Sequence, residues 1–395
     1  MLGGAKTVAD LVSGKELVDV EAENSVEAVL ELLKEHDILA VPIYGAAPIL
    51  RRHAARRGAG AAHLFEGGRQ YCGIVSVLDL VAFVVNRERG AGSKADAKLS
   101  GGESAAGAAS AADASKAESA CADAGGAAGA DAADADAASL RSALESPVHL
   151  ALGATSESTS LWIEPATLSV WSAVEKLAKG AHRLLVPLPG GSVRLVTQSD
   201  ALRFLAQCHR GPHCQPELRG LLDSRLYDLN LGPGQDVPLL RVDASAPLLE
   251  TLSAMATQQV RAVPVLQQRR LVSTLSVSDL RGMAASSLRS FDRVTVSGFL
   301  KGLHPELAYV AHPQLVGTDT LPAPLTCRSD DRLIDIIDSL LGCNVHRSWV
   351  VNNQLHPLHA VSATDVLLAV LNARPLLEGT HFQHAHLPVQ DDQDT

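Results

Sequence analysis

A short motif that occurs four times constrains this chain more than any other feature. In each copy a serine or threonine precedes an aspartate by three residues, after an apolar run and before a helical apolar pattern. A hydroxyl and an acid at this spacing are typical of a capping box at the first turn of a helix. The four copies are Ser76 with Asp79, Thr197 with Asp200, Ser276 with Asp279, and Ser362 with Asp365.

The elements around the motif also repeat. Residues 325–371 show their order most clearly. Leucines and isoleucines at helical spacing are followed by two short apolar runs, then by the motif and a second helical pattern. The four aspartates are 121, 79 and 86 residues apart, and the first gap falls to 72 without the biased residues 91–139. A recurring order of elements with a period of about 80 residues is an internal repeat. We therefore predict four units, each with the order strand, helix, strand, strand, helix.

These repeats resemble the CBS domain. The wider pattern resembles the regulatory gamma subunits of AMP-activated and sucrose-non-fermenting-related protein kinases, in particular the plant and algal gamma-like branch. The phrases that carry the resemblance are YCGIVSVLDLVAF, KGAHRLLVPL, VRAVPV, LTCRSDDRL and VHRSWVV. The resemblance implies an α/β (α+β) fold in which four CBS repeats of the β-α-β-β-α type pack as two Bateman pairs.

The repeats and the segments between them set the predicted domain boundaries. We place repeat one at 1–90, repeat two at 140–210, repeat three at 236–298 and repeat four at 299–374. The remaining segments are a basic loop insertion at 46–70, a low-complexity linker at 91–139, a connector at 211–235 and an acidic tail at 375–395. The linker is rich in alanine, glycine and aspartate, so it cannot bury enough apolar surface to offset the entropy of ordering. We predict that it is disordered.

Two of these segments leave alternatives open. Four arginines between 51 and 57 could dock an acidic partner, although charge clusters are more often a solvated surface, which we favour. The connector region holds Cys208, His209, His213 and Cys214, which could bind zinc. The spacing is not that of a usual zinc finger, and the Gly211-Pro212 pair is typical of a turn. We therefore favour the reading without a metal.

Composition excludes several classes of protein. The formal net charge is −10 and only 3% of residues are aromatic, so neither a phosphate-binding basic face nor a base-stacking platform for nucleic acid is expected. No apolar run approaches the roughly 18 residues of a membrane span. The six cysteines are scattered and do not form a disulfide framework. The start carries early acids and no signal-peptide pattern. We expect a location in the cytoplasm or the nucleus, with no nucleic-acid or membrane partner.

The resemblance implies a nucleotide-binding role for the motif residues. In the family each aspartate accepts hydrogen bonds from the ribose hydroxyls of an adenosine nucleotide, because an ionised carboxylate is a strong, two-oxygen acceptor. The ribose-binding candidates are Asp79, Asp200, Asp279 and Asp365, and the capping hydroxyls are Ser76, Thr197, Ser276 and Ser362. For any one motif alone, we favour simple helix capping as the explanation of the pair.

Cationic residues open the middle strand of three repeats. The phosphate-binding candidates are His182, Arg183, Arg261, His346 and Arg347. A guanidinium suits phosphate because its planar fork donates two hydrogen bonds at once. A single histidine here could be purely structural, but two His-Arg pairs in register favour phosphate binding.

Repeat one departs from this pattern. Leu39 stands where the gamma subunits have an arginine, and Gly73 is a glycine where the other repeats have Arg194, Ser273 and His359. Repeat two keeps its aspartate, which animal gamma subunits lose. The first pair lacks the cation at Leu39, whereas repeats three and four have both aspartates and the cations Arg261, His346 and Arg347. We therefore predict that the tightest AMP site lies in the pair formed by repeats three and four.

The leading hypothesis is a non-catalytic regulatory subunit for energy sensing. It would bind AMP, ADP or ATP, need no cofactor or metal, and dock on the alpha (catalytic) and beta subunits of a heterotrimeric Ser/Thr kinase. The alternative is a stand-alone CBS-domain nucleotide sensor, or a scaffold for another partner. An enzyme ranks third, because the sequence contains no nucleophile–base constellation, phosphate-cradling glycine loop, HExxH or CxxC.

Overall fold

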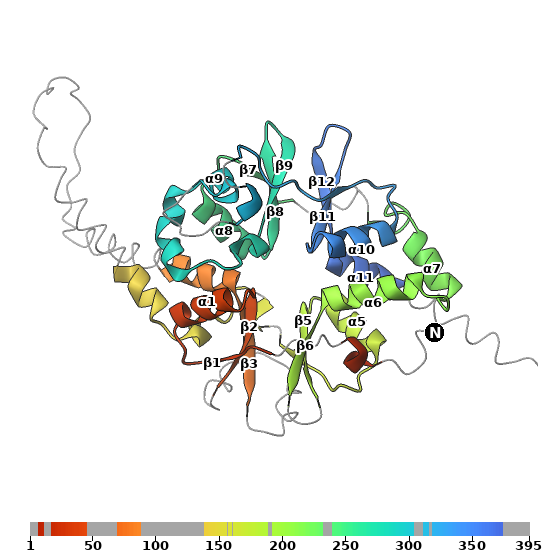
Figure 1. Ribbon diagram of the computed structural model, residues 1–395, viewed down its shortest axis with the longest axis horizontal. Helices are drawn as coiled ribbons and strands as arrows, with labels where there is room; N and C mark the ends of the chain where they lie inside the picture. The colour runs from red at the N-terminus through yellow and green to blue at the C-terminus, as the bar shows by residue number, and fades with distance from the viewer. Residues whose placement is uncertain are drawn as a thin grey trace, which may run out of the picture.

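The computed structural model describes most of the chain outside its biased segments (Figure 1). The described residues are 7–11, 17–45, 69–87, 138–155, 157–159, 161–188, 192–231, 239–303, 311–315 and 318–373. The predictions for the arginines of the insertion, the low-complexity linker and the acidic tail fall outside these ranges. Within them, no helix is long and apolar enough to cross a membrane.

Four units with the same order of elements follow one another along the chain. Repeat one contains β1 (Val20–Glu21), α1 (Val26–Glu35), β2 (Ala40–Tyr44), β3 (Tyr71–Ser76) and a helix over residues 77–87. Repeat two contains β4 (Trp162–Ile163), α5 (Val170–Ala178), β5 (Arg183–Pro187), β6 (Val193–Thr197) and α6 (Gln198–Arg210). The helix α7 (Pro216–Asp223) leads on to the third unit.

The second half repeats this order. Repeat three contains β7 (Val242–Asp243), α8 (Leu248–Thr257), β8 (Ala262–Gln267), β9 (Arg270–Ser276) and the 3-10 turn η4 (Val277–Leu280), followed by η5 (Ala285–Arg293) and α9 (Val296–Lys301). Repeat four contains β10 (Thr326–Cys327), α10 (Leu333–Gly342), β11 (Arg347–Val351), β12 (Pro357–Ser362) and α11 (Ala363–Asn372). In each unit the first strand pairs parallel with the middle strand, and the third pairs antiparallel with it.

The predicted β-α-β-β-α repeat is confirmed, with one correction. The expected second helix of repeat three is only the four-residue turn η4. Its capping box is intact, but Arg281 is extended and Gly282 has a φ of 80°. Glycine adopts this left-handed conformation readily, so the chain turns away after one turn instead of continuing a helix.

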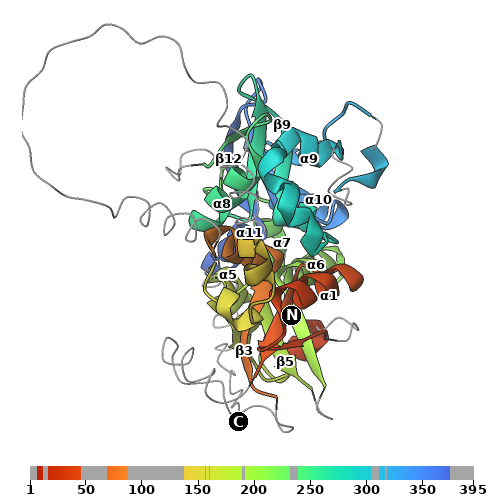
Figure 2. The same cartoon turned by 90° about the vertical axis from the view of Figure 1, so that its left-hand side faces the viewer.

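Sheet contacts join the repeats in the two predicted pairs. Tyr71 of repeat one packs against Ile163 and Leu185 of repeat two. On the other side, Leu271 of repeat three packs against Trp349 of repeat four, whose indole Nε1 donates to Thr274 Oγ1 at 2.8 Å. Figure 2 shows the strands of repeats one and two at one end of the molecule and those of repeats three and four at the other. The two-pair architecture of the predicted fold is therefore confirmed.

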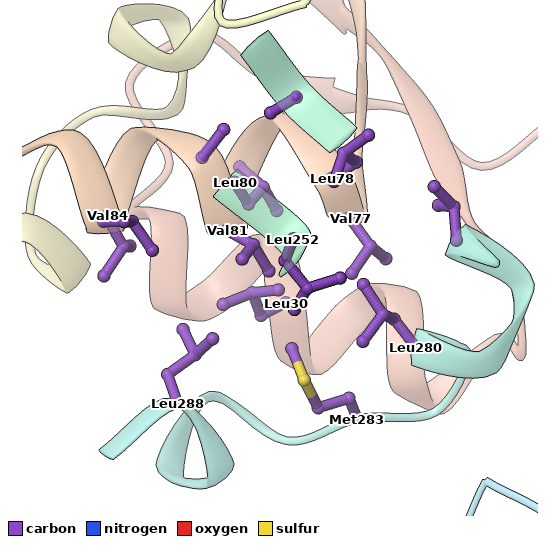
Figure 3. Packing of buried hydrophobic residues seen from close by; sticks show 14 of the residues in the cluster. Leu30, Val77, Leu78, Leu80, Val81, Val84, Leu252, Leu280, Met283 and Leu288 are labelled. Carbon is purple, nitrogen blue, oxygen red and sulfur yellow. The ribbon is translucent and has the colours of Figure 1, made fainter. Parts of the chain in front are cut away.

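Helix contacts join the repeats in the other direction. The helices of repeats one and three share one large apolar core, in which Leu30 and Val81 meet Leu252 and Leu280 (Figure 3). The helices of repeats two and four share a second core of the same kind. Burying both helix faces in this way removes apolar surface from water and holds the two pairs together. The loops that open the middle strands then face one another at the centre of the molecule.

Each first helix begins beside a strand-like bridge to a distant segment. Ser25, Ser169, Pro247 and Arg332 are the N-cap residues of α1, α5, α8 and α10, and their bridge partners are Pro147, Thr7, Thr295 and Arg225, respectively. Thus the chain start packs on repeat two, whereas residues 138–151, which follow the linker, pack on repeat one. Leu152 and Ala154 continue this packing, and Leu152 and Ser158 lie against Gly73 of β3.

Candidate functional site

All four motifs cap their helices in the same way. In each one, Oδ2 of the aspartate accepts the backbone N–H and the hydroxyl of the serine or threonine three residues earlier, at 2.5–3.0 Å. Capping is therefore a real role of every motif. It also occupies one carboxylate oxygen, so that only Oδ1 remains for a ligand.

The four Oδ1 atoms have different surroundings. Asp79 Oδ1 accepts from the backbone N–H of Thr155 at 2.9 Å and from its hydroxyl at 2.6 Å. Asp200 Oδ1 is paired with Arg203 at 2.6 Å, and Asp279 Oδ1 with His312 at 3.0 Å. Asp365 Oδ1 has no hydrogen-bond or ion-pair partner among the described residues. The four motif aspartates share one sequence pattern but differ in the partners of their Oδ1 atoms.

Backbone contacts fix how the repeats correspond at the opening of the middle strand. The carbonyls of Leu39, Arg261 and His346 accept, at 2.9–3.0 Å, from the N–H of the first residue after the third strand. Arg261 is therefore the counterpart of His346, and Ala262 is the counterpart of Arg347. In repeat one the same place is taken by Leu39, whose side chain is buried in the core.

The five cationic candidates lie together at the centre. His346 is close enough to His182, Arg183, Arg261 and Arg347 for each of them to lower its pKa. The loss of hydration among these side chains is the largest cause, and together these effects lower the pKa of His346 to about 4, although the residue keeps substantial solvent exposure. Burial also lowers the pKa of His182. The histidines are thus neutral near pH 7, and the positive charge of the cluster comes from its arginines.

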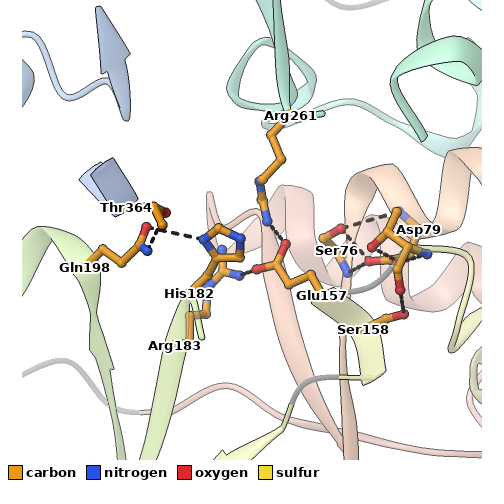
Figure 4. A network of polar contacts seen from close by, with 10 residues as sticks. Ser76, Asp79, Glu157, Ser158, His182, Arg183, Gln198, Arg261 and Thr364 are labelled. Atoms are coloured by element: carbon orange, nitrogen blue, oxygen red, sulfur yellow. Dashed lines mark hydrogen bonds and ion pairs between the residues drawn. The ribbon is translucent and has the colours of Figure 1, made fainter. Parts of the chain in front are cut away.

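The arginines have different partners. Burial lowers the pKa of Arg183 and of Arg347 to about 10, which leaves both protonated at neutral pH. Arg183 and Arg261 both form ion pairs with Glu157 (Figure 4). Arg347 donates to the carbonyl of Ala262 at 3.1 Å and has no carboxylate ion pair among the described residues. The nearby Asp365 opposes the lowering of its pKa.

A bridge between repeats two and four borders this cluster. Gln198 Nε2 donates to the hydroxyl of Thr364 at 2.9 Å and to the carbonyl of Leu177 at 3.0 Å. Its Oε1 lies 3.3 Å from His182 Nδ1. The bridge fixes the starts of α6 and α11 relative to each other, and so sets the place of Asp365 beside the arginines.

Sequence reasoning missed Thr155 and Glu157, the two residues that engage Asp79 and two of the arginines. The signal that could have found them is Gly73 on β3. A Cβ atom at Gly73 would lie 2.5 Å from Leu152 Cδ2 and 2.8 Å from the carbonyl oxygen of Ser158. A glycine in a strand often marks such a close approach.

The alternative of a zinc site in the connector gains no support. His209 Nε2 lies 3.0 Å from Asp223 Oδ1, and the Cys214 thiol donates to the carbonyl of Gln215. In the part of the chain that the structure describes, no three His, Cys, Asp or Glu side chains are grouped as metal ligands would be.

Comparison with known proteins agrees with this architecture. Residues 235–285, which cover most of repeat three, match the CBS domain family. The SNF1-related protein kinase regulatory subunit gamma-like PV42b of Arabidopsis thaliana is 27% identical over 265 residues, which cover 61% of this chain and 72% of that protein. The 5'-AMP-activated protein kinase subunit gamma-3 of Bos taurus is 27% identical over 207 residues, or 51% of this chain and 38% of that protein.

A solved structure supports the arrangement of all four repeats. The crystal structure of protein MJ1225 from Methanocaldococcus jannaschii covers 92% of this chain and 99% of its own, with a TM-score of 0.53 and 15% identity. At this identity the likeness concerns the fold. The chain thus contains a CBS domain and is similar to gamma-type regulatory subunits of protein kinases.

Proposed function

We propose that this chain is a non-catalytic, gamma-like regulatory subunit that binds an adenine nucleotide in repeat four. It would dock on the alpha and beta subunits of a heterotrimeric Ser/Thr kinase in the cytoplasm or nucleus. The observation that carries the proposal is that Asp365 and Arg347 lie near each other without forming an ion pair. Among the described residues, Asp365 is the motif acid whose Oδ1 has no partner, and Arg347 beside it has no carboxylate partner.

The two side chains suit the two ends of a nucleotide. Asp365 Oδ1 can accept a charge-assisted hydrogen bond from a ribose hydroxyl, while Oδ2 continues to cap α11. Arg347 can donate to a phosphate, and its partly buried surroundings strengthen that attraction relative to open water. Regulation would follow if the nucleotide binds one arrangement of the kinase complex more tightly than another.

Calorimetric titration of the purified chain with AMP, ADP and ATP tests the binding. Asp365→Asn keeps the shape and capping ability of the side chain but removes its charge, so we expect affinity for the bound nucleotide to fall about tenfold. Asp335→Asn is the matched control, because Asp335 lies in the same repeat and pairs with Arg332 at the surface. If folded Asp365→Asn binds the nucleotide as tightly as the parent, the proposed site is ruled out.

Co-purification with the kinase subunits tests the docking. Recovery of alpha and beta subunits with the tagged chain supports the regulatory-subunit proposal. Nucleotide binding without those subunits would favour the alternative of a stand-alone CBS-domain sensor. If the chain neither binds a nucleotide nor recovers the kinase subunits, the result would favour a scaffold for another partner.

A further inference from the structure

Residues 152–155 and 157–159 form a segment beside Asp79 of repeat one, the counterpart of Asp365 in repeat four. Thr155 donates twice to Asp79 Oδ1, from its backbone N–H and from its hydroxyl. This oxygen is the counterpart of the Asp365 oxygen that we assign to a ribose hydroxyl. As a result Asp79 accepts four hydrogen bonds and is 0% exposed.

The same segment brings an anion to the arginine cluster. The two carboxylate oxygens of Glu157 are shared between Arg183 of repeat two and Arg261 of repeat three. The Glu157 side chain is only 10% exposed, and Figure 4 shows it between the two guanidinium groups. A carboxylate taken this far from water needs such partners, because an unpaired buried charge is strongly destabilising. Glu157 therefore stands where a ligand phosphate would be held.

The segment forms a tight loop that packs closely against β3. The Ser158 hydroxyl accepts from the N–H of Gly153 at 2.7 Å and donates to the carbonyl of Thr155 at 2.8 Å, which folds the segment into a tight loop. The loop lies directly on β3 because Gly73 has no side chain. At the corresponding place repeats two, three and four have Arg194, Ser273 and His359, each of which carries the Cβ atom that Gly73 lacks.

We propose that the segment around Thr155 and Glu157, described at residues 152–155 and 157–159, is an internal ligand that fills the nucleotide site of repeat one. Thr155 takes the place of the ribose hydroxyls on Asp79, and Glu157 takes the place of the phosphate on Arg183 and Arg261. The inference rests on the proposed function of the equivalent site in repeat four. It predicts a competition at the centre of the molecule. A ligand phosphate reaches Arg183 and Arg261 only by displacing the Glu157 carboxylate.

Inorganic phosphate is the probe for this competition. Glu157→Gln keeps the size of the side chain and leaves the two arginines without their anion. We expect phosphate, at constant ionic strength, to raise the thermal midpoint of Glu157→Gln by at least about 2 °C more than that of the parent. Glu164→Gln is the matched control, since Glu164 is a similarly covered carboxylate that pairs with Lys176 away from the centre. Its phosphate response should equal that of the parent.

Equal phosphate responses in folded Glu157→Gln and in the parent would overturn the inference. If Glu157→Gln does not fold, Glu157→Asp carries the test, because it keeps the charge on a shorter side chain. A larger phosphate response than the parent then supports the internal ligand, and an equal response overturns it.

AMP titration separates this inference from the proposed function. If AMP binding depends on Asp365 but Glu157→Gln gains no phosphate response, the internal ligand is rejected and the repeat-four site stands. If Glu157→Gln gains the phosphate response while neither it nor the parent binds AMP, Glu157 is an internal anion as inferred. In that case the proposed nucleotide function fails.

Discussion

Asp79 and Asp365 show how the same motif can have opposite surroundings. Both carboxylates use Oδ2 to cap a helix, with nearly the same distances to a serine three residues earlier. Oδ1 of Asp79 is covered by Thr155, 76 residues away in the sequence, whereas Oδ1 of Asp365 has no partner among the described residues. Local sequence fixes the cap, and a distant segment decides whether a ligand can reach the acid.

The largest difference is expected in stability. Asp79→Ala leaves the N–H and hydroxyl donors of Ser76 and Thr155 without their acceptor in a fully buried place. We expect a loss of about 3 kcal/mol or more in the free energy of unfolding. Asp365→Ala removes a partly exposed cap and should cost about 1 kcal/mol. Urea unfolding of both variants measures the difference, and equal costs would contradict the distinction between a filled and an open site.

Replacing Arg347 near Asp365 should weaken AMP binding more than replacing Arg183, which pairs with Glu157. Arg347→Ala should weaken AMP binding about tenfold or more, since it removes a charged hydrogen bond to phosphate, and should leave adenosine binding unchanged. Arg183→Ala should affect AMP less, because Arg183 is held by Glu157. Calorimetry with AMP and adenosine at two salt concentrations measures both effects. The AMP effect should shrink at high salt through screening, and a greater loss in Arg183→Ala would reverse the assignment.

Much of this architecture could be predicted from the sequence because its signals are local. Helical periodicity and capping boxes depend on residues within a few positions of one another, and they predicted four repeats. The packing of the repeats in two pairs was implied by the resemblance to the CBS domain. They failed at η4, where Gly282 ends the turn. The five cationic candidates could be recognised because each opens a strand at a corresponding place.

The connecting segments could not be placed from sequence. Thr155 and Glu157 lie in a stretch without apolar periodicity, and their partners are on three different repeats. Such contacts depend on tertiary packing rather than on local preference. Gly73 was noticed as a departure of repeat one, and only the structure shows that it admits the side chain of Leu152 and the backbone carbonyl of Ser158.

Gly73→Ala tests whether that close approach holds the segment in place. The added Cβ would overlap Leu152 Cδ2 and the fixed carbonyl of Ser158, so we expect a loss of about 1–3 kcal/mol in the free energy of unfolding. Gly220→Ala is the matched control. Gly220 lies in α7 with nothing near its missing Cβ, so the change should stabilise the helix by up to about 1 kcal/mol. A neutral Gly73→Ala would mean that residues 152–159 move away from β3 without cost.

The smallest expected effect is on the pH dependence of stability. The pKa of His346 is lowered to about 4 in the folded chain, from an ordinary value of 6.5. The unfolded chain therefore binds more protons, and the contribution of His346 to stability is present above about pH 6.5 and lost as pH falls toward 4. Because the imidazole retains solvent contact, we expect less than about 1 kcal/mol.

Urea unfolding at pH 7.5 and pH 5 compares the parent with His346→Gln, and the parent should lose more stability between the two. Repeat one has Leu39 at the corresponding place, which cannot titrate, so this pH dependence should come from the open site and not from the filled one. AMP should reduce the loss in the parent, because a bound phosphate favours the protonated imidazole. An identical pH dependence in parent and variant would show that burial and the surrounding arginines do not hold His346 neutral.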